Sequence, residues 1–179
     1  MALRRDLAFK GLPIGDFFHA TEDKQAVRDA VFDLIKQHSS MSVHAQIMEK
    51  SKAQMQVRAT NERFYQHGWY YLFKNGTAKT IIPGAEVLVT AASVGTKKKQ
   101  RVFSAAVNDV IQQTVRRKSG QYATSFCPSI GEPCLQIVDY CTWAIQRKWE
   151  KGDTRSYDLI KNRIVYEYDL WAHGTKHYY

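Results

Sequence analysis

The sequence has few cysteines and no long apolar run. Three of its 179 residues are cysteine, and this odd number argues against the paired disulfide framework of a small secreted protein. No segment approaches the roughly 18 apolar residues of a membrane span, and no apolar leader follows Met1. These absences predict a cytoplasmic protein with no membrane segment. The length predicts one domain, residues 1–179, which is large enough to bury its own core.

Acidic residues are also comparatively scarce. The chain has 17 Asp and Glu against 26 Lys and Arg, so its formal net charge is +9. A positive excess favours a polyanionic partner such as nucleic acid, although a basic surface can equally serve solubility. The three cysteines, Cys127, Cys134 and Cys141, are seven residues apart. Because zinc-binding pairs are usually two to four residues apart, this spacing predicts thiols in the core rather than a zinc site.

No glycine-rich nucleotide-binding loop is present either. The basic stretch from Gly95 to Arg101 lacks the lysine spacing of a Walker sequence, so it does not predict a nucleotide site. We expect it to be an exposed loop before a helix. Its cations are either simply solvated or contact the phosphate backbone of a nucleic acid as substrate-binding residues: Lys97, Lys98, Lys99 and Arg101.

What the chain does contain is an alternation of strand and helix patterns. Strands are expected within residues 7–18 and at 41–47, 86–92, 122–127 and 165–171. Helices are expected after an N-cap at Thr21, near 61–76, between Arg101 and Gly120, at 133–151 and after Asp153. Residues 86–92 are nearly all apolar, which is typical of a central strand covered on both faces. The pattern predicts an α/β sheet with helices packed on it, followed by a tail at 174–179.

The clearest predicted helix runs from Pro133 to Lys151, because proline suits a first helical turn and Gly152 can end a helix in the left-handed conformation. Its expected buried stripe consists of Leu135, Val138, Thr142, Ile145 and Trp149. Asp139 projects about 40° from Leu135 around the axis, at the edge of this stripe. A carboxylate in that position either bonds to protein groups or acts as a metal ligand or general base, and the sequence alone leaves both interpretations open.

Two segments resemble a known family. Residues 135–140, Leu-Gln-Ile-Val-Asp-Tyr, follow a loop with Ser129, and His19-Ala20-Thr21-Glu22-Asp23 precedes a helix with Arg28. Both are similar to the family catalogued as domain of unknown function 3800, which is considered ribonuclease-H-like. The resemblance implies a mixed sheet flanked by helices, phosphodiester chemistry with Mg²⁺ or Mn²⁺, and an association with mobile elements or phage defence.

The resemblance also implies roles for individual residues. Asp139 would be the helix-borne metal ligand and catalytic carboxylate, with His19 and Asp23 as further catalytic residues. Glu132 would be a second metal ligand. Ser129 and Gln136 would contact the substrate.

One family feature is missing. Members open with a strand that carries Asp-Glu-Ser-Gly, and this tetrapeptide occurs nowhere in the sequence. We therefore expect an N-terminally truncated ribonuclease-H-like domain, whose exposed sheet edge a protein partner or a second copy would cover. Two functions follow as hypotheses: a metal-dependent nuclease-like protein, or a non-catalytic nucleic-acid-binding or assembly subunit that has lost the first catalytic strand.

Overall fold

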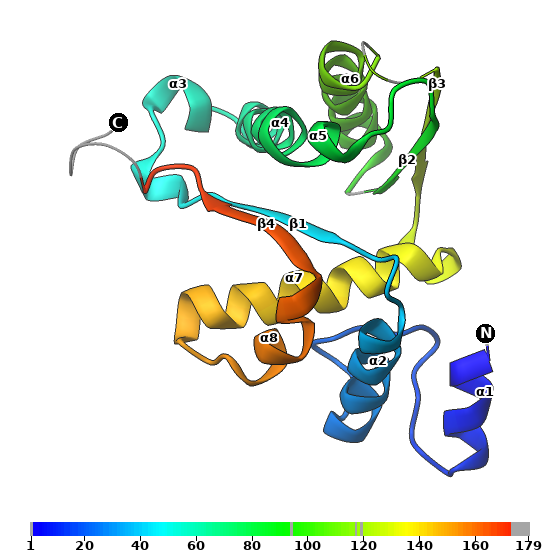
Figure 1. Cartoon of the computed structure of the whole chain (residues 1–179). Coiled ribbons are helices and arrows are strands. Elements are labelled where there is room, and N and C mark those ends of the chain that lie inside the picture. The colour runs from blue at the N-terminus through cyan, green and yellow to red at the C-terminus, as the bar shows by residue number, and fades with distance from the viewer. Residues whose placement is uncertain (1, 94, 117, 119, 173–179) are drawn as a thin grey trace. The chain divides into compact units, whose positions relative to one another are not determined.

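The computed structural model describes residues 2–93, 95–116, 118 and 120–172 (Figure 1). The chain divides into two compact units, each made of two chain segments. Unit 1 comprises Met1–Val43 and Pro128–Val165, and unit 2 comprises His44–Cys127 and Tyr166–Tyr179. Compact units of this kind are not necessarily domains that fold separately, so the single domain at 1–179 stays a prediction.

Unit 1 is mainly helical. Its helices are α1 (Ala2–Phe9), α2 (Gln25–Gln37), α7 (Pro133–Lys151) and α8 (Arg155–Ile160), with single 3-10 turns at Ser129–Gly131 and Lys161–Arg163. Helix α7 packs against both α2 and α8. The buried side chains of α2 recur at three- and four-residue steps and give it one apolar face: Val27, Val31, Phe32 and Ile35.

Unit 2 contains a parallel pair of strands and the helix that connects them. Strand β2 (Glu86–Ala92) pairs with β3 (Gln121–Cys127) in a register that runs from Glu86 opposite Gln121 to Ala92 opposite Cys127. Helix α6 (Lys97–Thr114) makes the crossover. The remaining helical segments are a 3-10 turn at Lys50–Lys52, α3 (Met55–Arg58), α4 (Asn61–Tyr71), a π-helical turn at Leu72–Thr77 and α5 (Ala78–Thr80).

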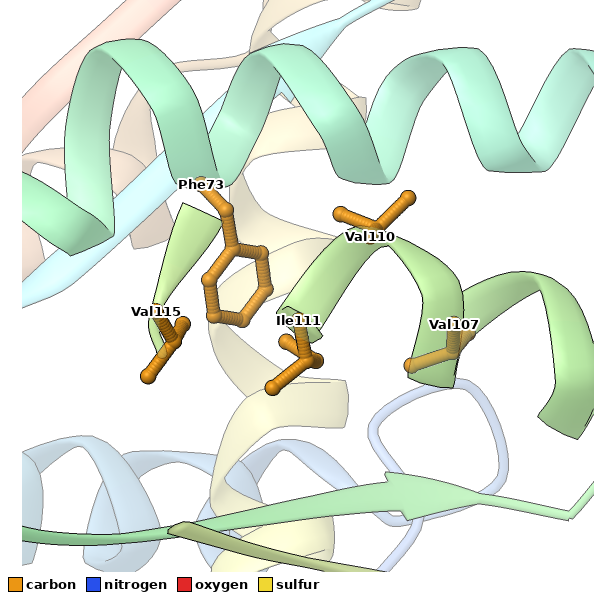
Figure 2. Close-up of a cluster of buried hydrophobic side chains, with 5 residues drawn as sticks. All are labelled: Phe73, Val107, Val110, Ile111 and Val115. Carbon is orange, nitrogen blue, oxygen red and sulfur yellow. The ribbon is translucent and has the colours of Figure 1, made fainter. Parts of the chain in front are cut away.

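The core of unit 2 lies around α6. Figure 2 shows its buried side chains, which are Phe73, Val107, Val110, Ile111 and Val115. Aromatic residues of α4 pack against this cluster, and Trp69 stacks on Phe73 with ring centroids 5.5 Å apart. The aromatic residues of 61–76 therefore contribute to a hydrophobic core.

A second two-stranded sheet consists of β1 (Val43–Ile47) and β4 (Ile164–Asp169). The boundary between the two units falls within these strands. Within the described residues, the strands form two sheets of two strands each. The structure thus confirms a mixed α/β protein with small sheets and helices. No helix among these residues has both the length and the apolar character needed to cross a bilayer.

Several predicted elements are confirmed. Helix α7 has the predicted bounds, and Gly152 ends it with a φ of 66°, in the left-handed region that favours glycine. The strands predicted at 41–47, 86–92, 122–127 and 165–171 correspond to β1, β2, β3 and β4. The predicted tail at 174–179 lies outside the described residues.

The first predicted strand is wrong. Residues Ala2–Phe9 form α1, and a turn follows it. Leu3 and Leu7 are four residues apart and can share one helix face, and this short spacing is a weaker signal than the turn-forming Gly11, Pro13 and Gly15 that follow. The N-cap at Thr21 is wrong as well, because α2 begins only at Gln25, after Lys24. Residues 19–23 form a turn of their own.

Two predictions about unit 2 are also wrong. The basic stretch is not a loop, because α6 begins at Lys97 and its first turn carries the lysines. Strand β2 is not central: β3 is its one hydrogen-bonded neighbour within the described residues, and Leu88 is 68% exposed. Val87 and Val89 pack against the core, so one face of β2 is covered and the other is open.

The buried face of α7 differs from the predicted stripe. Val138 is 55% exposed and Trp149 is 44% exposed. The observed buried side chains are Leu135, Tyr140, Cys141, Ala144 and Ile145. At 100° per residue, the centre of this face is displaced by about 100° from the predicted one. The reason is packing against α2, where Phe32 meets Tyr140 edge to face with ring centroids 5.5 Å apart.

Candidate functional site

The turn from His19 to Asp23 meets α7 at Asp139. Within the turn, the backbone N–H of Asp23 donates to the carbonyl of His19 at 2.9 Å, and the His19 N–H donates to Oδ2 of Asp23 at 2.9 Å. The Ala20 N–H donates to Oδ2 of Asp139 at 2.9 Å. His19 and Asp23 from one predicted segment and Asp139 from another are therefore close together in unit 1.

His19 lies beside the Asp139 carboxylate. Its Nδ1 atom is 3.5 Å from Oδ2 of Asp139, and the two side chains are 36% and 37% exposed. The Nδ1 atom also accepts the Thr21 N–H at 3.3 Å. In the neutral imidazole this contact leaves the proton on Nε2, whereas protonation of Nδ1 would give Asp139 a positive partner. The pair can thus hold or release a proton where solvent has access.

Asp23 stabilises the turn through hydrogen bonds of its buried carboxylate. The residue is 8% exposed, and its Oδ2 accepts from both the His19 N–H and the Tyr140 hydroxyl. Burial, followed by the hydrogen bond to Asp23, raises the pKa of Tyr140, so the phenol remains a donor. With its carboxylate bonded within the protein, Asp23 positions His19 rather than facing solvent.

Gln136 and Arg28 hold the two ends of the turn. The side-chain carbonyl of Gln136 accepts the Phe18 N–H at 3.2 Å, while its amide donates to the carbonyl of Ser129 at 2.9 Å. Arg28 donates through Nη1 to the carbonyls of Ala20 and Asp23, at 3.0 and 2.6 Å. Gln136 and Ser129 are thus adjacent to the predicted catalytic residues, and Ser129 contributes its backbone oxygen.

Glu132 has a different position. It is the N-cap of α7, and its carboxylate accepts the Cys134 N–H at 3.0 Å. Seven residues separate it from Asp139, or about 10 Å along a helix axis. Within the described ranges, no three His, Cys, Asp or Glu side chains are grouped so that they could hold a metal ion. Glu132 as a metal ligand stays a prediction.

A divalent ion is still compatible with the Asp139 carboxylate. Mg²⁺ commonly binds through one or two carboxylates, with waters and substrate phosphate oxygens completing its shell. Asp139 fits this role because its Oδ2 is bonded once to a backbone N–H and its side chain is partly exposed. In phosphodiester chemistry such an ion would supply Lewis acidity.

The predicted basic residues belong to unit 2. Lys97, Lys99 and Arg101 are exposed on the first turns of α6, and the side chain of Lys98 lies outside the described set. The helix dipole disfavours cations at an N-terminus, so these charges do not stabilise α6 through it.

Sequence reasoning named Asp139 but missed two residues that hold its surroundings. Tyr140 follows it directly and bonds to Asp23, and Trp143, one turn further along α7, contacts Arg28. The available signal was the spacing: Trp143 and Arg147 follow Asp139 at i+4 and i+8, on the same side of the helix.

Comparison of the chain with protein-family models, curated proteins and solved structures found no significant match.

Proposed function

We propose that this protein is a nuclease-like phosphodiesterase that acts on nucleic acid, with His19 and Asp139 at its reacting centre. The observation that supports it is the pairing of these two side chains, 3.5 Å apart and partly exposed, with His19 on a turn that the buried Asp23 and Tyr140 hold in place. In this proposal His19 transfers the proton and Asp139 holds Mg²⁺ or Mn²⁺. A ribonuclease-H-like ancestry and a role in phage defence or a mobile element belong to the same proposal.

The proposed mechanism uses the tautomer of His19. In this mechanism the unprotonated Nδ1 takes the proton of an attacking water and releases the Thr21 N–H, and the imidazolium so formed gives its Nε2 proton to the leaving oxygen, which restores the neutral imidazole. The Asp139 carboxylate lies 3.5 Å from Nδ1, where the first proton arrives. The backbone bond from Ala20 fixes the orientation of that carboxylate.

The test is cleavage of labelled single-stranded RNA, single-stranded DNA and an RNA–DNA hybrid with Mg²⁺ or Mn²⁺. Asp139→Asn keeps an acceptor for the Ala20 N–H but removes the charge, so we expect a loss of about 10²-fold or more in rate. Asp33→Asn is the matched control, because Asp33 is an exposed acid on α2 of the same unit. Equal rates for wild type and Asp139→Asn would contradict the proposal, as would no cleavage of any substrate.

A non-catalytic nucleic-acid-binding or assembly subunit is the second candidate. The observation that favours it is the exposed start of α6, where Lys97, Lys99 and Arg101 present cations without a stabilising role in the helix. Salt-dependent binding of the same oligonucleotides without cleavage would support this candidate over the first.

A further inference from the structure

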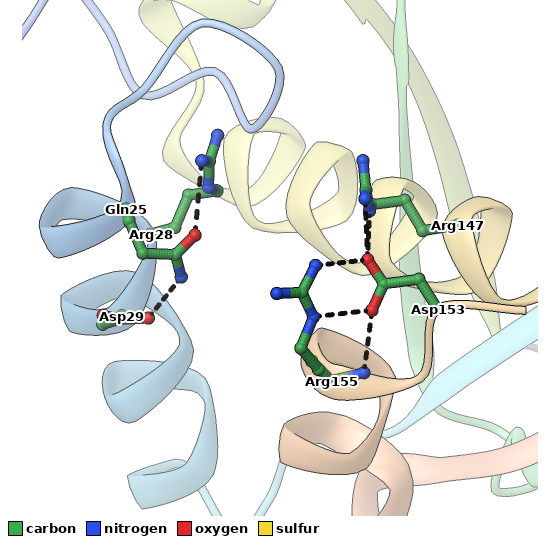
Figure 3. Close-up of polar contacts among 6 residues, drawn as sticks. All are labelled: Gln25, Arg28, Asp29, Arg147, Asp153 and Arg155. Carbon is green, nitrogen blue, oxygen red and sulfur yellow. Dashed lines mark hydrogen bonds and ion pairs between the residues drawn. The ribbon is translucent and has the colours of Figure 1, made fainter. Parts of the chain in front are cut away.

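Two arginines of unit 1 lie against one tryptophan of α7, and a third arginine shares an acid with one of them. The guanidinium carbons of Arg28 and Arg147 are 5.2 and 5.1 Å from the ring centroid of Trp143. Arg147 and Arg155 both bond to Asp153 (Figure 3). We call these four residues, Arg28, Trp143, Arg147 and Arg155, the arginine–tryptophan strip.

The strip continues from the His19–Asp139 pair. Asp139, Trp143 and Arg147 are four residues apart on α7, so they follow one side of the helix over about 12 Å. Arg28 connects the two features, because its Nη1 bonds to the carbonyl of Ala20 while the N–H of that residue bonds to Asp139. Arg28 thus lies next to the proposed reacting centre, and Arg147 lies about two helical turns from Asp139 along α7.

The strip has more positive charge and more N–H donors than its internal contacts use. Asp153 is a single carboxylate shared by two guanidinium groups. Arg147 and Arg155 each contact it through Nε and Nη2, and each guanidinium has five N–H donors, so further donors are not committed to this acid. The side chain of Arg155 is 85% exposed, and that of Arg147 is 29% exposed. The nearby acid Asp29 accepts a hydrogen bond from Gln25, so it does not directly neutralise the excess positive charge of the strip.

The geometry points to a binding site for the sugar–phosphate backbone of a nucleic-acid strand along the arginine–tryptophan strip. Planar guanidinium groups match the oxygens of a phosphate and can be held in place by stacking on an aromatic ring. Three neighbouring cations suit a polyanion better than a single carboxylate, since phosphates of one strand repeat about every 3.4 Å of helix axis. This inference rests on the proposed function for the identity of the ligand.

A purely structural role for the same contacts predicts something different. If Arg147 and Arg155 served only to fix Asp153 at the start of α8, removing the acid would bring no gain in binding. If they bind phosphate, Asp153 competes with the ligand for their donors. Asp153→Asn should therefore tighten nucleic-acid binding, a change in the direction opposite to that expected from damage to the fold.

The experiment measures the anisotropy of a fluorescein-labelled 12-nucleotide strand, as RNA and as DNA, without divalent ions so that cleavage does not intervene. We expect Arg155→Gln to weaken binding on the order of fivefold and to lower the slope of log affinity against log salt by about 0.7, as for one lost phosphate contact to a single strand. Arg5→Gln is the matched control, because Arg5 is an exposed arginine on α1 of unit 1. Asp153→Asn should bind more tightly than wild type.

The inference is overturned if Arg155→Gln binds like Arg5→Gln, or if Asp153→Asn binds no more tightly than wild type. Its failure can be told apart from failure of the proposed function. Cleavage that requires Asp139, together with unaltered binding by the strip variants, would remove the strip alone. Binding that depends on the strip, without any cleavage, would remove the phosphodiesterase proposal and leave the strip.

Discussion

Tyr140 links the buried face of α7 to the turn that carries His19. Its hydroxyl donates to Asp23, and its ring is fully buried against Phe32. Tyr140→Phe keeps the ring and removes the donor, leaving a buried carboxylate with one fewer partner. We expect the free energy of unfolding in urea to fall by about 1–3 kcal/mol. Tyr65→Phe, at a tyrosine that is 54% exposed, should change it by less than about 0.5 kcal/mol. Equal effects of the two substitutions would contradict the importance of the Asp23 bond.

The raised pKa of Tyr140 gives the same contact a pH dependence. Because burial and the bond to Asp23 raise this pKa in the folded state, the folded protein retains the phenolic proton above the pH at which the unfolded chain loses it. The stabilisation is complete below about pH 10 and is lost as the pH rises above that value. Wild type should therefore lose more stability than Tyr140→Phe between pH 9 and 11, measured by urea unfolding at each pH. Parallel curves would show that Tyr140 titrates as in an unfolded chain.

The thiols of α7 differ in reactivity. Burial raises the pKa of Cys141 to about 12, whereas Cys134 is exposed at the start of the helix. Because the thiolate is the reactive form, we expect iodoacetamide at pH 8 to modify Cys134 in the folded protein and Cys141 only after unfolding in urea. Peptide mass spectrometry distinguishes the two sites. Modification of Cys141 at a similar rate in the folded protein would contradict the observed orientation of α7.

At the scale of elements, the end of α7 depends on one backbone conformation. Gly152 has a φ of 66°, and a Cβ added there would meet no atom within 4 Å, so any cost of Gly152→Ala comes from the backbone alone. We expect a loss of about 1 kcal/mol in the free energy of unfolding. Gly131→Ala is the control, because that glycine also has open space but not a positive φ. If both variants unfold alike in urea, the left-handed cap is not what ends the helix.

Elements whose ends are marked by local chemistry could be predicted from the sequence. Pro133 and Gly152 mark the bounds of α7 through local backbone preference, and the alternation at 41–47 indicates a strand regardless of its partner. The side of α7 that is buried could not be predicted, because Val138 and Cys141 are both apolar enough for a core. Contact with Phe32 on another element decides between them. Residues 2–9 were missed because glycines and a proline nearby outweighed a short helical spacing.

The candidate site was predictable in part of its membership and not in its geometry. His19, Asp23 and Asp139 were named from segment resemblance, and they are close together in unit 1. Their bonds could not be foreseen, since the Tyr140 hydroxyl and the Arg28 side chain reach the turn only after α2 and α7 pack. The family resemblance, in which the Asp-Glu-Ser-Gly strand is missing, does not specify these contacts of Tyr140 and Arg28.

At the scale of the whole molecule, the protein should lose stability in mild acid. In unit 2, burial lowers the pKa values of His44 and His67, so the folded state favours their neutral forms. The stability from these groups is present above about pH 6.5 and is lost as the pH falls through their lowered pKa values. We expect urea midpoints to fall between pH 7 and 5, and to fall less in His44→Gln.

An exposed histidine provides the comparison for that measurement. His38→Gln, at the end of α2, should follow the pH dependence of wild type. If His44→Gln also follows wild type, the acid sensitivity comes from groups other than these partly buried imidazoles.

The hydrogen bond from Ala20 to Asp139 joins positions 119 residues apart, and this separation has a consequence for biosynthesis. Ribosomes add roughly 5–20 residues per second, so about 6–24 s pass between synthesis of the two residues. During that interval the emerging chain has His19 without its acidic neighbour, while β2, α6 and β3 are already complete. The nascent protein is therefore unable to pair His19 with Asp139 until α7 has been made, and the turn at residues 19–23 must wait for that partner.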